Sequence, residues 1–175
     1  MTIRKATKND IRSIADIYTE VQIACENGTM TTGWKRGVYP TAATAEAALA
    51  RDDLFALEDG GKTVGTAIIN QCQDDAYAGA NWQYPAPREK VMVLHTLAIS
   101  PSASGKGYGR KFVEFYEEYA LAHGCHYLRM DTRESNVIAR SIYKKFGYSE
   151  IGVVTCNFNG IEGVRLVLLE KHLDN

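Results

Sequence analysis

The spacing of apolar residues predicts four helices. After Thr7, where Asp10 completes a capping box, apolar residues recur in steps of three and four. They are Ile11, Ile14, Tyr18, Val21 and Cys25. An alanine-rich helix is expected over residues 41–51, and two further helices over 109–123 and 136–146. Gly124 and Gly147 follow the last two helices, at the position where glycine commonly ends a helix.

Shorter apolar runs between these helices predict strands. They cover residues 3–6, 54–58, 63–70, 91–99, 126–132, 148–155 and 163–170. The turn at residues 59–61, Asp-Gly-Gly, favours a hairpin between the second and third runs. The run 91–99 is apolar at both parities apart from His95 and Thr96, as expected of a central strand that is covered on both faces. The chain is therefore expected to form one α/β domain over residues 1–175.

Two segments have no sustained period and are expected to be long loops. They are residues 27–40 and 71–90. Loops of this length are uncommon in a compact domain unless they bind a ligand or act as a lid. Five aromatic residues in them are candidates for lining an acceptor pocket, the alternative being that they only cover the core beneath each loop. They are Trp34, Tyr39, Tyr77, Trp82 and Tyr84.

Composition and charge exclude several classes of partner. The chain has 175 residues, is 45% hydrophobic and carries a formal net charge of −1. Because nucleic-acid binders usually carry a basic excess, no nucleic-acid partner is expected. The apolar runs are much shorter than the roughly 20 residues that span a bilayer, and the first residues are charged. We therefore expect no membrane partner, no secretory signal and a cytoplasmic location.

The cysteines and histidines show no ligand spacing. The cysteines are far apart, at Cys25, Cys72, Cys125 and Cys156, without a C-x-x-C pair. Four buried, reduced thiols are expected, two disulfides being the alternative. No histidine lies at a metal-ligand distance from a cysteine or a glutamate, so no metal site is expected.

The chemically informative segment is the glycine-rich loop 104–110, SGKGYGR, between a predicted strand and a predicted helix. Glycines allow backbone N–H groups to converge, and the helix N-terminus adds partial positive charge, which together suit phosphate oxygens. Lys106, Arg110 and Lys111 add charge. The Walker pattern is absent, and a dinucleotide fingerprint would need glycine where Arg110 stands. The alternative is a helix-entry turn that binds nothing.

Three motifs in register give this chain a family resemblance. They are LHTLAISP at 94–101, GKGYGR at 105–110, and N-x-x-A-x-x-x-Y-x-x-x-G-Y at 136–148. Together with the order of the elements, they resemble the GNAT superfamily of acetyl-CoA-dependent N-acetyltransferases. The resemblance implies a mixed, mostly antiparallel, twisted sheet of six to seven strands, splayed at the central strands, with about four helices.

The resemblance also implies where acetyl-CoA, as co-substrate, would be held. The Q/R-x-x-G-x-G/A signature falls on residues 104–109, whose amides would hold the pyrophosphate, although Ser104 replaces the usual Gln or Arg. The strand at 97–99 would run beside the pantetheine arm, with the amide of Leu97 or Ala98 as oxyanion donor. The implied cofactor-binding residues are Leu97, Ala98, Ile99, Ser104, Gly105, Lys106, Gly107, Tyr108, Gly109, Arg110, Asn136, Ala139 and Tyr143.

Two residues are expected to do the chemistry. Tyr143 matches the family tyrosine that protonates the departing thiolate; a purely structural core aromatic is the alternative. An alkylamine must lose a proton before it attacks, and His95 resembles the histidine of the arylalkylamine branch that acts as base through water. A core histidine with satisfied hydrogen bonds is the alternative. Asp131, Glu134 or water alone are further candidates for the base. Asn136 or Ser135 is equally expected as a helix N-cap.

The resemblance therefore implies an N-acetyltransferase that moves acetyl from acetyl-CoA to a primary amine by direct attack in a ternary complex. The expected acceptor is a small molecule, such as a polyamine, arylalkylamine, amino acid or aminoglycoside. A protein N-terminus or lysine is the alternative within the enzyme class, and a CoA-binding sensor without turnover is the alternative outside it. A homodimer is left open.

Overall fold

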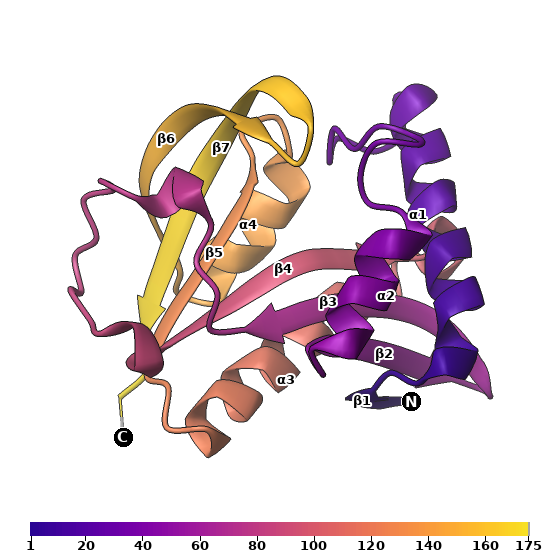
Figure 1. Cartoon of the computed structure of the whole chain (residues 1–175), viewed down its shortest axis with the longest axis horizontal. Coiled ribbons are helices and arrows are strands. Elements are labelled where there is room, and N and C mark those ends of the chain that lie inside the picture. The colour runs from indigo at the N-terminus through magenta and orange to yellow at the C-terminus, as the bar shows by residue number, and fades with distance from the viewer. Residues whose placement is uncertain (175) are drawn as a thin grey trace.

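The computed structural model describes residues 1–174, which form a mixed seven-stranded sheet with helices on both faces (Figure 1). The strand order is β1-β2-β3-β4-β5-β7-β6, and only the β4–β5 pair is parallel. The strands are β1 (Thr2–Lys5), β2 (Leu54–Asp59), β3 (Lys62–Asn70), β4 (Val91–Ile99), β5 (Tyr127–Arg133), β6 (Ser149–Phe158) and β7 (Ile161–His172). The helices are α1 (Ile11–Glu26), α2 (Ala42–Ala50), α3 (Tyr108–Ala122) and α4 (Val137–Lys145).

The α/β class, the strand count and the helix count predicted from the sequence are confirmed. The elements differ from prediction mainly at their ends. The first helix begins with a short 3-10 turn, Lys8–Asp10, because Asp10 accepts a hydrogen bond from the Thr7 amide at 2.7 Å. The 71–90 segment also contains short 3-10 turns, Asp75–Tyr77 and Arg88–Lys90.

One face of the sheet packs against α3 and α4. The largest buried cluster lies here, and its aromatic residues Phe112 and Tyr116 of α3 are fully buried against the central strands. The Tyr116 hydroxyl donates to the carbonyl of Met92 on β4 at 2.7 Å and lies 3.1 Å from that of Arg129 on β5. This hydrogen bonding fixes α3 beneath the parallel strand pair.

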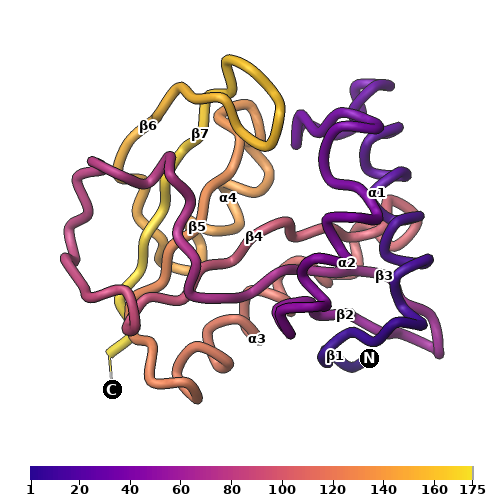
Figure 2. The backbone as a smooth tube through the Cα atoms, in the orientation of Figure 1, coloured from indigo at the N-terminus to yellow at the C-terminus, as the bar shows by residue number. Residues whose placement is uncertain are grey.

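The opposite face is covered in two parts. Helices α1 and α2 pack on β2 and β3, where Ile14, Tyr18 and Leu54 are buried. The segment 71–90 arches over the half of the sheet that contains β7 and β6 (Figure 2), and Tyr77 is buried there against Val91 and Val93 of β4. The middle of β4 therefore lies between the part of this face that α1 and α2 cover and the part that the 71–90 segment covers.

The sheet opens between β4 and β5. Parallel pairing runs from Val91 with Tyr127 to Leu94 with Met130, and no pair beyond Leu94 exists among the described residues. On its other edge β4 contains a bulge, because Ile68 of β3 pairs with His95 while Thr66 pairs with Ala98. Thr96 in this bulge has φ of 51°, a left-handed conformation that is rare for a β-branched residue. The splay predicted for the central strands is therefore present.

The cysteines are only partly as expected. All four are free thiols. Cys125 is buried, Cys25 and Cys156 are half-buried, and Cys72 is exposed. The expectation of four buried thiols is confirmed only for Cys125. Cys25 and Cys156 are only partly buried, and Cys72 is exposed because it lies where the chain leaves the sheet after β3. None of the helices in residues 1–174 is long and apolar enough to cross a membrane.

Candidate active site

A cavity of about 1000 Å³ lies at the splay and is lined from both faces of the sheet. From the α3 and α4 side it is lined by Tyr108, Ala139 and Tyr143. From the other side it is lined by His95 and Asp131, together with parts of the segments 29–34 and 72–74. The cavity therefore connects the glycine-rich loop with the polar residues that the sequence left as candidate bases.

The glycine-rich loop presents a row of free backbone amides. Gly105 and Gly107 both have φ of 78°, and a Cβ added at either would meet no atom within 4 Å. Across residues 1–174, no acceptor pairs with the amides of residues 105–110; the first bond of α3 runs from Lys111 N to Gly107 O. Such amides at a helix N-terminus favour a phosphate group. The loop therefore fits the pyrophosphate that the sequence assigned to it.

Helix α4 brings two predicted residues to the same cavity. Asn136 is the N-cap of the helix, since its side-chain oxygen accepts from the Ala139 amide at 3.3 Å. The N-cap expectation for Asn136 is thus confirmed, and its amide nitrogen is left for other contacts. Tyr143, one helical turn beyond Ala139, is 7% exposed and lines the cavity.

Tyr143 keeps its proton in this position. Burial raises its pKa well above the usual value, and the negative charge of Asp131 adds to the effect. No described residue accepts or donates a hydrogen bond at its hydroxyl. A protonated hydroxyl that faces a cavity without a partner is placed to donate to a bound group.

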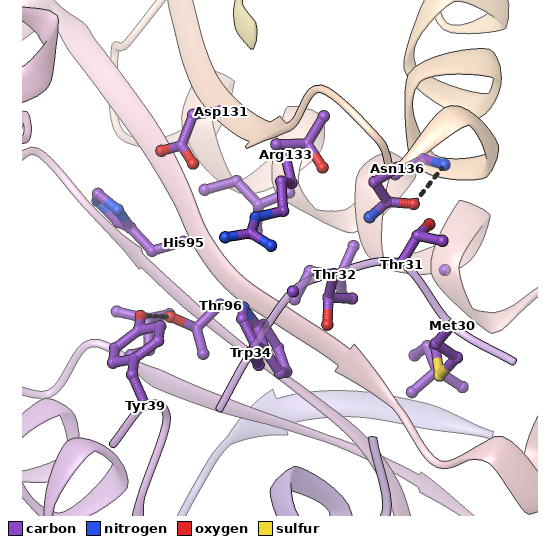
Figure 3. A pocket seen from close by; sticks show the side chains of 18 of the residues that line it. Met30, Thr31, Thr32, Trp34, Tyr39, His95, Thr96, Asp131, Arg133 and Asn136 are labelled. Carbon is purple, nitrogen blue, oxygen red and sulfur yellow. Dashed lines mark hydrogen bonds between the residues drawn. The ribbon is translucent and has the colours of Figure 1, made fainter. Parts of the chain in front are cut away.

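The bulge in β4 is tied to the loop that follows α1. The hydroxyls of Thr96 and Tyr39 are hydrogen bonded, and Tyr39 packs edge-on against Trp34 (Figure 3). Both aromatic residues line the cavity. The strained backbone at Thr96 is therefore fixed by the 27–40 segment. Beyond Leu94, β4 no longer pairs with β5 along the edge that faces the splay.

The hydrogen bonds of His95 define its tautomer. Its Nε2 lies 3.0 Å from the carbonyl oxygen of Cys72 and 3.2 Å from Oδ1 of Asn70. The side-chain amide of Asn70 is oriented by two hydrogen bonds: its nitrogen donates to Asp53, and its oxygen accepts from the backbone N–H of Cys72. Both atoms near Nε2, the Cys72 carbonyl oxygen and Asn70 Oδ1, are therefore acceptors. Nε2 consequently carries the proton, and the lone pair is on Nδ1. Burial lowers the pKa of His95 below its ordinary value of 6.5, which keeps the ring neutral at pH 7.

Asp131 is a half-buried carboxylate on β5 at the cavity wall. The Tyr77 hydroxyl donates to its Oδ2 at 2.8 Å. Burial raises the pKa of Asp131 to about 6; the Tyr77 bond opposes this, and the negative charge of Asp74 adds to it. Asp131 is therefore ionised for the most part at pH 7, with a protonation that is sensitive to small changes near neutrality.

One residue that lines the cavity, Arg133, was missed from the sequence. Arg133 lines it from β5, two residues after Asp131, and points toward Thr32 and Trp34 (Figure 3). The segment 29–34 forms the opposite wall. The only sequence signal was the two-residue period of the strand, which places Asp131 and Arg133 on one face.

Several predicted residues lie outside the lining. The side chains of Ala98 and Lys106 are not part of it, although both belong to the segments that were expected to hold the cofactor. Glu134 is paired with Arg165 at 2.6 Å and does not line the cavity. Of the five aromatic residues expected at an acceptor pocket, Trp34 and Tyr39 line it. Tyr77, Trp82 and Tyr84 do not, because they cover the sheet under the 71–90 segment.

Known proteins share this architecture. Residues 16–148 match the model of the acetyltransferase (GNAT) family. An uncharacterized N-acetyltransferase from Methanocaldococcus jannaschii is 23% identical over 154 residues, which are 87% of this chain and 62% of that protein. The chain thus spans less than two thirds of that relative's length.

Two solved structures have the same fold. A GNAT-family acetyltransferase from Streptococcus agalactiae 2603 superposes with a TM-score of 0.82 at 23% identity, covering 99% of this chain and 96% of that one. A putative acetyltransferase from Salmonella typhimurium, solved with its cofactor acetyl-CoA, gives a TM-score of 0.71 at 18% identity, covering 100% and 95%. The family match, the splayed sheet and the free amides of the glycine-rich loop lead to one conclusion: the chain belongs to the GNAT acetyltransferase family.

Proposed function

We propose that this protein is an N-acetyltransferase that transfers acetyl from acetyl-CoA to a primary amine of a small molecule. The observation that carries the proposal is the single cavity through the splay, with the phosphate-type loop at one end and His95 and Asp131 at the other. Such a cavity lets a thioester and an amine meet without a covalent enzyme intermediate. Direct attack in a ternary complex is therefore the proposed mechanism.

Acetyl-CoA supplies an activated acetyl group and a thiolate leaving group. The amides of residues 105–110 would hold its pyrophosphate, and Arg110, with no ion-pair partner in the described part of the chain, adds positive charge beside them. The open space above Gly105 and Gly107 leaves room for the phosphate oxygens to approach the backbone. Asn136 and Ala139 line the path between this loop and Tyr143.

The amine must be neutral when it attacks. We propose that Asp131 binds the acceptor amine in its ammonium form, because the carboxylate is mostly ionised at pH 7 and its Oδ1 has no described partner. His95 then takes the proton through a water molecule on Nδ1, the only ring nitrogen with a lone pair. A neutral histidine with a lowered pKa is ready to accept this proton across the physiological range.

Two further groups act on the leaving side. As the nitrogen–carbon bond forms and the carbon–sulfur bond breaks, negative charge develops first on the acetyl oxygen and then on sulfur. The amide of Leu97 or Ala98, in the bulged part of β4, is the proposed donor to the oxygen. The Tyr143 hydroxyl is the proposed proton donor to the sulfur, because its raised pKa keeps the proton available. The second proton that the nitrogen loses on becoming an amide restores the Tyr143 hydroxyl, so the only proton released overall is the one that His95 takes.

The shape of the acceptor end favours a small acceptor. The segment 29–34 and the turn between β6 and β7 both contribute to the cavity wall, so the acceptor end has walls on two sides. Trp34 and Ile161 make part of this wall apolar. A compact molecule can be enclosed there with little exposed surface.

Two measurements test the function. Acetyl-CoA at 100 times its Kd should stabilise the protein by about 2.7 kcal/mol, seen as a higher melting temperature; no rise would refute the cofactor assignment. Thiol release should then be followed with a panel of polyamines, arylalkylamines, amino acids and aminoglycosides. Tight CoA binding without turnover on any amine, or on N-terminal and lysine peptides, would instead indicate a sensor.

A further inference from the structure

Arg133 presents an unpaired guanidinium to the acceptor end of the cavity. It is half-buried, and no oxygen of residues 1–174 pairs with it. The other arginines that are not exposed have partners: Arg4 binds Asp10 at 2.9 Å, and Arg140 binds Glu150 at 2.7 Å. A half-buried guanidinium that no protein oxygen pairs can pair with an anionic group of a ligand in the cavity.

Arg129, on the same strand, provides the internal comparison. Its guanidinium donates to the carbonyl of Tyr84 at 3.2 Å and to Gln73, and it lies 4.0 Å from the centre of the Trp82 ring. Arg129 therefore holds the 71–90 segment on the sheet. Arg133 has no such structural task among the described residues, although it lies on the same face of β5, two strand periods further along.

The backbone opposite Arg133 is adapted to its side chain. Gly33 has φ of 69°, and a Cβ at this position would lie 2.2 Å from Nη1 and 2.4 Å from Cδ of Arg133. Any larger residue at position 33 would displace the guanidinium. The 27–40 segment thus lies directly on Arg133, and this contact orients the side chain in the cavity.

The neighbouring charge is negative and at a fixed spacing. Asp131 and Arg133 are two residues apart on β5, so their side chains point to the same face and their Cα atoms are about 7 Å apart. Asp74 also lines this part of the cavity. One face of a single strand therefore offers a carboxylate and a guanidinium side by side (Figure 3).

We propose that the acceptor is an amino carboxylate, a small molecule with a primary amine and a carboxylate, and that Arg133 binds the carboxylate while Asp131 holds the amine. This inference rests on the proposed function and narrows it. Planar bidentate pairing with a carboxylate is the geometry that a guanidinium provides best. Polyamines, arylalkylamines and aminoglycosides have no anionic group and would leave Arg133 unpaired.

The remaining wall indicates the rest of the acceptor. Trp34, Val164 and Leu166 line the cavity around the two charged groups. These side chains provide an apolar surface for the substituent of an amino acid. Amino acids with apolar or aromatic side chains are therefore the expected acceptors.

The first experiment compares acceptors on the unmodified protein. Initial rates of thiol release are measured with phenylalanine, phenethylamine and phenylalaninamide, and likewise with leucine, 3-methylbutylamine and leucinamide. The carboxylate should raise kcat/KM by roughly 30- to 100-fold over the matched amine or amide, as charge-paired recognition would give. Equal values for acid and amine would overturn the inference while leaving the proposed function standing. Failure to release thiol with any of the six acceptors would instead contradict the proposed function.

The second experiment removes the guanidinium. Arg133→Met should raise the KM for the amino carboxylate by roughly 30- to 100-fold and leave kcat/KM for the matched amine and the KM for acetyl-CoA unchanged. Arg133→Lys should recover only part of the lost affinity for the amino carboxylate, because a lysine ammonium cannot form the two parallel hydrogen bonds that a guanidinium makes with a carboxylate. The matched control is Arg12→Met, an exposed arginine on α1, which should leave all constants unchanged.

Other outcomes identify other roles. Equal loss for acids and amines in the Arg133→Met protein, or a raised KM for acetyl-CoA, would assign Arg133 to folding or to the cofactor and overturn the inference. A lower melting temperature with the acid preference retained would do the same. Faster acetylation of a peptide with N-terminal phenylalanine than of phenylalanine itself would mean that Arg133 binds a main-chain carbonyl, which also overturns it.

Discussion

The two ends of the cavity are built from different parts of the chain. The cofactor end consists of backbone amides from one continuous segment, residues 104–110. The acceptor end consists of side chains from β4, β5 and the segments 29–34 and 72–74, which are far apart in the sequence. The first end depends on φ angles that glycine permits, whereas the second depends on charges and on the hydrogen bonds that orient them.

This difference predicts how each end responds to substitution. A side-chain change at the cofactor end leaves most amides in place and should have a modest effect on the KM for acetyl-CoA. A single substitution at the acceptor end removes either a full charge, as at Asp131 or Arg133, or the one ring nitrogen of His95 that can accept a proton. Tyr143 lies between the ends and belongs to the chemistry itself, so the largest effect is expected there.

Tyr143→Phe should lower kcat by roughly 10²- to 10⁴-fold, the usual contribution of a positioned acid, with little change in either KM. The reason is that Phe keeps the buried ring and removes only the proton. Steady-state kinetics with acetyl-CoA and the best acceptor give the answer. Tyr148→Phe, whose buried hydroxyl also has no described partner, is the matched control. Unchanged kcat in Tyr143→Phe would leave the residue a purely structural role.

His95→Ala and Asp131→Asn should alter different pH profiles. His95 acts only when neutral and its pKa is lowered, so kcat should be constant above pH 6.5 and fall at lower pH. Asp131 pairs with the amine only when ionised, so kcat/KM should fall as the pH drops through about 6. His95→Ala should abolish the limb in kcat, and Asp131→Asn the limb in kcat/KM, each with roughly a 100-fold loss at pH 7.

The same experiment distinguishes the candidate bases. If the limb in kcat persists in His95→Ala and disappears in Asp131→Asn, Asp131 is the base. If both variants keep it, water alone serves. Either result would leave the acceptor end dependent on side chains for binding the amine and would change only which group accepts its proton.

The contrast also explains what the sequence reveals. The glycine-rich loop can be recognised because its function needs glycine at fixed positions in one short stretch, as at Gly105 and Gly107. The β4 strand was predicted from the apolar pattern of residues 91–99, and the splay was predicted from the family resemblance. Arg133 and its contact with Gly33 could not be predicted, because they lie 100 positions apart and depend on how the 27–40 segment folds back. The role of the aromatic residues in 71–90 was ambiguous because burial of a loop core and lining of a pocket favour the same residue types.

Gly107→Ala tests the backbone end. Gly107 has φ of 78° and open space around it, so alanine adds only the cost of a left-handed conformation, about 1 kcal/mol. The alanine should shift the loop away from this conformation, and because acetyl-CoA binding must restore it, the KM for acetyl-CoA should rise roughly 5-fold. Gly61→Ala, with φ of 75° and equally open space in the β2–β3 turn, is the matched control for stability. An equal KM in both variants would mean that the loop conformation does not determine cofactor binding.

Ser104→Gln is the smallest change and the one that would improve the protein. The family signature has Gln or Arg at this position, and Ser104 is exposed at the rim of the cavity. One added side-chain hydrogen bond is worth about 1 kcal/mol, so the KM for acetyl-CoA should fall about 5-fold with kcat unchanged. Ser104→Ala should match the unmodified protein, because the amides rather than the hydroxyl do the binding. A large loss in Ser104→Ala would contradict the backbone-built character of the cofactor end, since a single short side chain would then account for most of the affinity.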